Sequence, residues 1–365
     1  MFELSHITLR GNTRPRLDDV TLTIASGRTA IVGYSGAGKT SLMNVLAGFE
    51  RADAGTVRTT LEGQPTTDAR TRLPFYWVPQ NGGLWPHLTV DQHLRCVSSA
   101  ESTDKLLRSL DLQQRSALPA ELSLGERSRL ALARALATRA EILLLDEPLS
   151  HVDPVRKPGY WNVIREVIGN GSSMGHDSRT AANPLIRPVG HLLPLEGGEG
   201  TSGKAGECSP QVSTGNGRAE YRGTSIVFTS HEPETVLRHA ENVICLQEGR
   251  VVFQGTTASL YDLPPSHEIG EFLGPLNWFD AEDAAVFVHD LKPSTGVIAI
   301  RPERMLLVAD SGSLIEYVSM TFRGGYAESV VRHVPSGGTR TVLHQVTGDL
   351  PATGERVRLI AGGGR

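Results

Sequence analysis

The alternation of apolar and polar residues near the start of the chain predicts a short antiparallel sheet. Residues 2–9 and 20–24 carry apolar side chains at alternating positions, as half-buried strands do. The LDDV segment at 17–20 is interpreted as a turn that leads into the second strand. Further strand-like runs follow at residues 56–61 and 74–79.

Two later segments have different patterns. From Val90 to Leu136 the apolar residues recur at helical spacing, which predicts a small helical subdomain over about residues 88–137. Residues 142–145 are apolar without alternation, and Asp146 and Glu147 follow them directly. Such a run is typical of a fully buried parallel strand that ends at the carboxyl edge of a sheet, where doubly wound folds bind ligands.

The C-terminal part of the chain returns to a strand pattern. From about residue 280 to 365, short alternating segments rich in β-branched residues are separated by turns that contain Gly and Pro. We expect a small all-β, OB-like module, a five-stranded barrel. Its histidines, His289, His333 and His344, lack ligand spacing and are interpreted as structural.

A long segment interrupts this organisation. A further strand is predicted at residues 225–229, and it ends in Ser230 and His231. The connection from Asp153 to that strand should need roughly thirty residues, but residues 169–223 lengthen it and are rich in Gly, Ser, Thr and Pro. We expect this insertion to be disordered, because it cannot bury enough apolar surface to offset its ordering entropy. A partner-binding element is an alternative.

The clearest chemical motif is GYSGAGKT at residues 33–40, which matches G-x-x-x-x-G-K-[ST] between a predicted strand and a predicted helix. In such a loop, backbone N–H groups and the helix N-terminus hold a polyphosphate. Lys39 adds a charge for the outer phosphates, and Thr40 offers a hydroxyl to magnesium. The motif predicts binding of a nucleoside triphosphate by Gly33, Ser35, Gly36, Ala37, Gly38, Lys39, Thr40 and Ser41.

Acidic residues at the end of the buried strand suggest hydrolysis. Asp146 is expected to hold magnesium, and Glu147 to take a proton from the attacking water. His231 is expected at the same sheet edge, within reach of the γ-phosphate, although a histidine at a strand end is more often structural.

Composition and charge limit the expected partners and the cellular compartment. The net charge of −4 and a pI near 6.3 argue against a broad nucleic-acid-binding surface. The three cysteines have neither metal-ligand nor redox spacing, which favours a reducing compartment. No apolar run approaches the ~20 residues that span a bilayer, so any membrane crossing is expected to belong to other chains.

Several motifs now stand in a fixed order: the phosphate loop, Gln80, LSLGE at 122–126, LLLDE at 143–147, SHVD at 150–153 and TSHE at 229–232. In this the chain resembles the ATP-binding subunit of a bacterial ABC transporter, of the importer group. The resemblance implies an ABC-type P-loop NTPase fold over residues 1–275. It also implies that residues 280–365 form a TOBE-like regulatory barrel.

The resemblance assigns roles by position. It implies that Asp146 and Glu147 are the Walker B magnesium ligand and catalytic base, and that Gln80 contacts magnesium and water. His231 becomes the switch histidine, and Asp153 the loop aspartate that crosses the dimer. Thr40, Gln80 and Asp146 would then be the magnesium ligands, and the signature residues Ser123, Gly125 and Glu126 would cap ATP bound to the opposite subunit.

The resemblance also implies partners. We expect an ATP-dependent homodimer on the cytoplasmic face of the inner membrane, peripheral to two permease subunits and served by an external solute-binding protein. ATP and Mg²⁺ are the expected cofactors, and nucleic acid is not an expected partner. The transported solute is left open among sugars, polyamines, iron(III), sulfate and molybdate. The alternatives are a nucleotide-binding regulator with impaired turnover and a soluble, non-transport ABC ATPase.

Two segments depart from the family pattern. The signature has Leu124 and Glu126 where glycine and glutamine are usual, and we expect activity to survive because Ser123 and Gly125 are kept. An aromatic residue that stacks on adenine is expected near Gly11, yet residues 10–16 contain none. Arg14 or Arg16 could stack its guanidinium plane there instead, with looser base selectivity.

Overall fold

The computed structural model describes residues 2–61, 64–66, 75–98, 100–169, 224–289, 296–346 and 351–362. The chain divides into two compact units, which are described separately. The first comprises Met1–Leu42, Ala52–Thr67 and Val227–Arg365, and the second comprises Met43–Arg51 and Asp68–Ile226. The predicted insertion, apart from Gly169, lies outside the described residues. No helix in the described ranges is long and apolar enough to span a membrane.

The N-terminal antiparallel sheet is confirmed, with the strand order β2-β1-β4-β5. It is built from β1 Phe2–Leu9, β2 Leu17–Ile24, β4 Ala54–Leu61 and β5 Gln64–Thr66.

The interpretation of residues 17–20 as a turn was wrong. These residues open β2, with Leu17 opposite Leu9 and Val20 opposite Ile7. The register shifts on either side of Ile7, and Asp19 has φ +54°. This irregularity leaves Asp19 exposed while Leu17 and Val20 are fully buried, so the polar pair does not interrupt the strand.

A second sheet of the first unit carries the phosphate loop. Its strand order is β10-β9-β3-β8, and β3 and β9 are parallel. The strands are β3 Arg28–Val32, β8 Ser225–Thr229, β9 Asn242–Gln247 and β10 Arg250–Thr256. The associated helices are α1 Lys39–Leu46, α6 Pro233–His239, α7 Thr257–Asp262 and α8 His267–Glu271.

The C-terminal β module is confirmed, but the predicted number of five strands was wrong. Its main sheet has six strands in the described residues, and the order β12-β18-β15-β16-β17 is joined by β14 on β18. A two-stranded pair, β11 with β13, and helix α9 complete it. The elements are β11 Asn277–Phe279, α9 Ala281–Phe287, β12 Val288–His289, β13 Ile298–Ile300, η3 Pro302–Arg304, β14 Met305–Ala309, β15 Ile315–Phe322, β16 Ala327–His333, β17 Thr339–His344 and β18 Arg356–Ala361.

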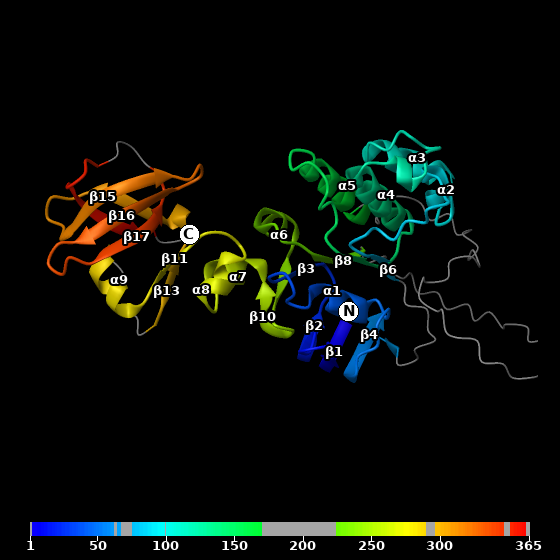
Figure 1. Cartoon of the computed structure of the whole chain (residues 1–365), viewed down its shortest axis with the longest axis horizontal. Coiled ribbons are helices and arrows are strands. Elements are labelled where there is room, and N and C mark those ends of the chain that lie inside the picture. The colour runs from blue at the N-terminus through cyan, green and yellow to red at the C-terminus, as the bar shows by residue number, and fades with distance from the viewer. Residues whose placement is uncertain are drawn as a thin grey trace, which may run out of the picture. The chain divides into compact units, whose positions relative to one another are not determined.

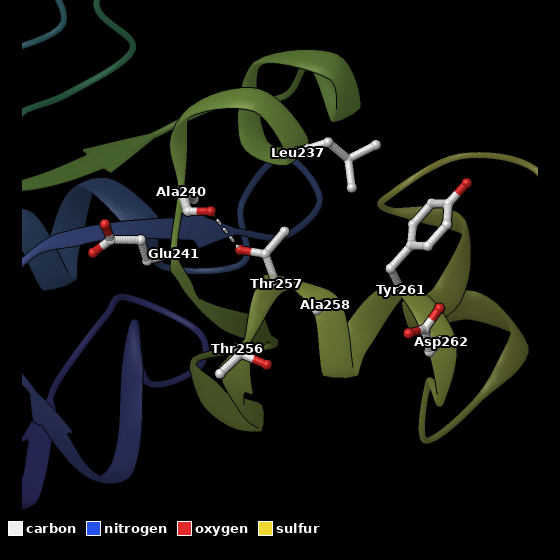
Figure 2. A pocket seen from close by; sticks show the side chains of 8 residues that line it. All are labelled: Leu237, Ala240, Glu241, Thr256, Thr257, Ala258, Tyr261 and Asp262. Carbon is white, nitrogen blue, oxygen red and sulfur yellow. Dashed lines mark hydrogen bonds between the residues drawn. The ribbon is translucent and has the colours of Figure 1, made fainter. Parts of the chain in front are cut away.

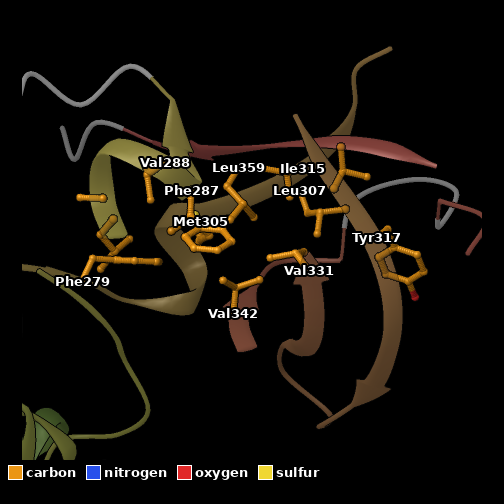
Figure 3. Packing of buried hydrophobic residues seen from close by; sticks show 13 residues of the cluster. Phe279, Phe287, Val288, Met305, Leu307, Ile315, Tyr317, Val331, Val342 and Leu359 are labelled. Atoms are coloured by element: carbon orange, nitrogen blue, oxygen red, sulfur yellow. The ribbon is translucent and has the colours of Figure 1, made fainter. Parts of the chain in front are cut away.

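The extra helix of this module has a local cause. The Asp280 side chain accepts a hydrogen bond from the Asp283 backbone and starts α9. Ala284 and Phe287 of the helix then pack into one hydrophobic core with Met305, Leu359 and the strands around them (Figure 3).

The second unit contains the helical region and the buried strand. Helices α2, α3 and α4 contact one another (Figure 1), and β6 and β7 pair in parallel. Helix α5 begins at Lys157, so Pro158 lies in its first turn, where a missing N–H costs little, and does not break the helix. The elements are β6 Phe75–Val78, α2 Val90–Arg95, α3 Ala100–Ser109, η1 Pro119–Glu121, α4 Leu124–Ala137, β7 Ile142–Leu145 and α5 Lys157–Gly169.

Candidate functional site

The phosphate loop connects β3 to α1 and is held by its own lysine. Lys39 is only 7% exposed, and its Nζ donates to the carbonyl oxygens of Gly33 at 2.9 Å and Tyr34 at 3.1 Å. The Ala37 backbone also donates to Tyr34, at 3.1 Å. Both hydrogen bonds therefore fix the Lys39 ammonium group within the loop that is predicted to bind the phosphates of the nucleotide.

The last glycine of the loop shows why the motif is built from backbone. Gly38 has φ +105°, and a Cβ atom there would lie 2.6 Å from the carbonyl oxygen of Arg16. The Gly249 backbone donates to the Ala37 carbonyl at 3.0 Å, and Asp18 donates to Gly249 at 2.9 Å. Only glycine fits where these three segments meet. Ser35, Gly36 and Thr40 of the loop are exposed, Gly33 and Ala37 are buried, and Ser41 is half-buried.

The second unit brings three predicted residues together. Asp146 follows β7 and is only 2% exposed, and its backbone donates to Val78 at the end of β6 at 2.9 Å. Gln80 lies two residues beyond Val78, and its Nε2 donates to Oε2 of Glu147 at 3.0 Å. Because β6 and β7 are parallel, both side chains emerge at the same end of this strand pair.

The backbone around Glu147 is unusual. Glu147 has φ +51° and Leu149 has φ +65°, in the left-handed region that non-glycine residues rarely adopt. Leu149 is buried, and hydrogen bonds from Ser150 to Glu147 and from Val152 to Leu149 close the turn. A non-glycine residue in this region costs on the order of 1–3 kcal/mol, and the role of Glu147 as the base stays a prediction.

The signature residues form the start of α4. Ser123 is the N-cap, and its hydroxyl and its backbone N–H both reach Oε2 of Glu126, at 2.7 and 2.9 Å. The Glu126 backbone donates in return to the Ser123 hydroxyl at 3.3 Å, which completes a capping box. The hydrogen bonds from the Ser123 hydroxyl and backbone lower the pKa of Glu126. A Cβ on Gly125 would lie 3.1 Å from the His151 carbonyl, so the signature turn packs closely on that segment.

The two remaining candidates have different local settings. His231 is exposed and lies between β8 and α6 in the first unit. Asp153, in the second unit, accepts from the Val155 backbone at 2.8 Å and shapes the turn that enters α5. Within the second unit, hydrogen bonds therefore link Gln80 with Glu147 and Ser123 with Glu126.

Arg134 is a buried residue whose contacts the sequence analysis did not anticipate. It is 3% exposed, it donates to the carbonyl oxygens of Gly82 and Gly83 at 3.0 and 2.8 Å, and it lies over the ring of Trp85 at 4.6 Å. It therefore ties α4 to the loop that follows Gln80. A single arginine inside the apolar LALARALA segment was the available signal, because a buried cation needs partners.

A hollow of 340 Å³ lies elsewhere in the first unit (Figure 2). Thr257 donates to the Ala240 carbonyl at its edge, and Tyr261 and Asp262 of α7 line it. It contains none of the predicted nucleotide-binding residues.

Comparison with known proteins identifies the family. The ABC transporter family matches residues 17–150. An Fe(3+) ions import ATP-binding protein, FbpC, of Yersinia enterocolitica is 36% identical over 363 residues, spanning 90% of this chain and 89% of that protein. The FbpC protein of Pseudomonas fluorescens Pf-5 is 30% identical over 323 residues, spanning 82% and 76%.

The fold agrees with this similarity. A solved structure described as the ATP binding subunit of an ABC transporter matches with a TM-score of 0.51 at 19% identity, covering 72% of this chain and 92% of that one. It supports the assignment of an ABC-type P-loop fold; the β module that follows is described above. The chain belongs to the family of ATP-hydrolysing, ATP-binding subunits of ABC transporters.

Proposed function

We propose that this chain energises the import of ferric iron. The observation that carries the proposal is the 36% identity to the Yersinia enterocolitica Fe(3+) import protein, which extends over 90% of this chain. A second Fe(3+) import protein at 30% identity supports the same solute. Among the solutes that the sequence left open, iron(III) is therefore favoured.

The proposed assembly is an ATP-bound homodimer on two permease subunits at the cytoplasmic face of the inner membrane. An external binding protein would deliver the iron to the permease. The family membership supports this assembly. The family resemblance also implies that the motifs that contact one ATP are divided between two subunits. Each ATP would be held by the phosphate loop of one chain and the α4 N-terminus of its partner.

In the proposed reaction, Glu147 is the general base. Water attacks the γ-phosphorus, its proton passes to the Glu147 carboxylate, and the bond from the γ-phosphorus to the bridging oxygen breaks to give ADP and phosphate. Gln80 orients the carboxylate through its 3.0 Å hydrogen bond. Lys39 stabilises the charge on the transferring phosphoryl group, and His231 orders it.

Magnesium fits the donor set of Thr40, Gln80 and Asp146. Magnesium in ATPases takes oxygen ligands, usually one or two carboxylates together with substrate phosphates. A hydroxyl, an amide oxygen and one carboxylate match that preference. Among the described residues no group of three or more His, Cys, Asp and Glu side chains could hold a metal by itself. Magnesium would neutralise charge on the phosphates during transfer.

The signature residues are proposed to act in trans. Ser123 would donate to the γ-phosphate of the partner's ATP, and for this its hydroxyl must turn away from Glu126, to which it donates at 2.7 Å. Gly125 would let the backbone approach the phosphate, and Asp153 would contact the partner subunit.

Uptake of radioactive iron(III) tests the proposal. Cells that lack the gene for this chain would receive either the wild-type chain or Lys39→Ala, with radioactive sulfate and molybdate as controls. We expect iron uptake to return with the wild-type chain only. Restored uptake of sulfate or molybdate, with no effect on iron, would contradict the assignment of the solute.

A further inference from the structure

The loop between β1 and β2 lies beside the phosphate loop and is rich in arginine. Its sequence is RGNTRPR, without an aromatic residue. The loop is anchored at both ends, because the Arg10 backbone donates to Asp53 at 2.7 Å and the Arg16 backbone donates to Leu9 at 2.8 Å. These hydrogen bonds hold the loop backbone at both ends, and the Arg16 carbonyl lies against Gly38 of the phosphate loop.

The two arginines considered for the base differ in direction. Nε of Arg16 donates to the carbonyl oxygen of Arg10 at 3.1 Å, so this side chain folds back onto its own loop. Nη2 of Arg14 would lie 3.9 Å from a Cβ atom on Gly36 and is, among described residues other than Gly36 and its two chain neighbours, the one heavy atom within 4 Å of that position. The Arg14 guanidinium thus sits at the exposed tip of the phosphate loop.

The present partner of Arg14 is weakly held. Nη1 of Arg14 and Oε1 of Glu248 are 3.4 Å apart, and the two side chains are 60% and 77% exposed. Exposed ion pairs of this kind contribute little to stability because water screens both charges. A polyphosphate carries more charge than a carboxylate and accepts two parallel hydrogen bonds from a guanidinium. An incoming nucleotide can therefore displace Glu248.

We propose that Arg14 is a nucleotide-binding residue whose guanidinium contacts the phosphates of ATP bound to the same chain. The inference rests on the proposed ATP-binding role of the phosphate loop. Arg14 exchanges Glu248 for the phosphates, and it supplies affinity that an aromatic residue stacked on adenine supplies elsewhere in the family. Because it contacts phosphate, it strengthens the binding of ATP and GTP alike.

Calorimetric binding of Mg-ATP and Mg-GTP to the full chain tests this assignment. We expect Arg14→Ala to weaken the binding of both nucleotides by about tenfold, as loss of a charge-assisted hydrogen bond does. Arg14→Lys should recover part of the lost affinity. Arg10→Ala is the matched control, since it removes an equal charge from the same loop, and it should change affinity by less than about twofold. Glu248→Gln should tighten binding by removing the competitor.

The outcomes separate the alternatives. Weaker binding of ATP with unchanged binding of GTP would overturn phosphate contact in favour of base recognition. Equal affinities of Arg14→Ala and the wild type would overturn any nucleotide contact by Arg14. If the wild-type chain bound neither nucleotide, the ATP-binding role of the phosphate loop would be contradicted. The wild-type titration alone separates this outcome from a failure of the Arg14 assignment.

Discussion

The phosphate loop and the signature segment are built in different ways. The phosphate loop takes its shape from backbone, with Gly38 at φ +105° packed against the Arg16 carbonyl. The signature segment takes its shape from side chains, because Ser123 and Glu126 satisfy each other. Substitutions that add a side chain in the phosphate loop should therefore disrupt it through steric clashes. The signature segment should tolerate substitutions that keep its capping hydrogen bonds.

The largest effect is expected at Gly38. Gly38→Ala would place Cβ 2.6 Å from the Arg16 carbonyl at a positive φ, and we expect ATP affinity to fall roughly tenfold to a hundredfold. Gly324→Ala is the control, since Gly324 also has a positive φ but nothing lies within 4 Å of its Cβ position. Equal affinities of the two variants in a calorimetric titration would show that the steric account of the loop is wrong.

The next largest effect is expected when either of two buried arginines, one in each unit, is substituted, because each substitution should lower the stability of its unit. Arg129 donates to the Leu110 and Asp111 carbonyls and to the Tyr160 hydroxyl. Arg301 donates to the carbonyls of Gly270 and Gly274. Replacing either with Met leaves buried acceptors unsatisfied, at about 1–3 kcal/mol.

Hydrogen exchange read by mass spectrometry locates these losses. We expect Arg129→Met to reduce protection around α3 and α4, and Arg301→Met to reduce it around α8 and β13. Loss of protection spread evenly over the chain in both variants would contradict the assignment of local roles.

Acid should destabilise both units through buried neutral histidines. Burial lowers the pKa of His93 and of His344 below the usual value of about 6.5. Nε2 of His93 accepts from the Trp85 backbone at 2.9 Å, and Nε2 of His344 is 2.8 Å from the Ser329 hydroxyl. The neutral form is therefore favoured in the folded chain.

The sign of the pH effect follows from these shifts. Above about pH 6.5 both the folded and the unfolded histidine are neutral, so the stabilisation is complete. As the pH falls below that value the unfolded histidine takes up a proton first, and stability is lost toward the lower folded pKa. Thermal melts from pH 7.5 to 5 should show a falling midpoint, less steep in His344→Gln. If the melting midpoint of His344→Gln fell with pH as steeply as that of the wild type, His344 would not contribute to the loss of stability in acid.

The smallest effect is expected at the signature. Glu126→Gln keeps the capping box, because a glutamine amide oxygen can accept the same hydrogen bonds, and the rate of ATP hydrolysis should stay within about twofold. Glu126→Ala removes the box at a cost of about 0.5–2 kcal/mol to the helix. A large loss of hydrolysis in Glu126→Gln would show that the carboxylate has a chemical role.

Patterns of backbone and burial were readable from the sequence. The glycine-rich loop between a strand and a helix and the buried strand before Asp146 follow from residue type and spacing, and the structure contains both. The helical spacing from Val90 to Leu136 likewise agrees with helices α2, α3 and α4. The Gln80 to Glu147 hydrogen bond joins residues that are far apart in the chain, and its prediction rested on the family resemblance.

Other features were not readable, for physical reasons. The LDDV segment belongs to a strand because a register shift and a positive φ at Asp19 accommodate its polar residues, which no periodicity rule anticipates. The sixth strand of the main C-terminal sheet was not predicted because β12 has only two residues, too few to show alternation. The direction of Arg14 depends on tertiary packing, which the sequence does not encode locally.

Release of phosphate from Mg-ATP, measured over a range of chain concentrations, tests the central claim most directly. If Glu147 is the base and each site needs the signature of a second chain, the rate per chain should rise with concentration. Glu147→Gln should abolish turnover while still binding ATP. A rate per chain that is independent of concentration, or a Glu147→Gln variant that turns over at the wild-type rate, would contradict the account.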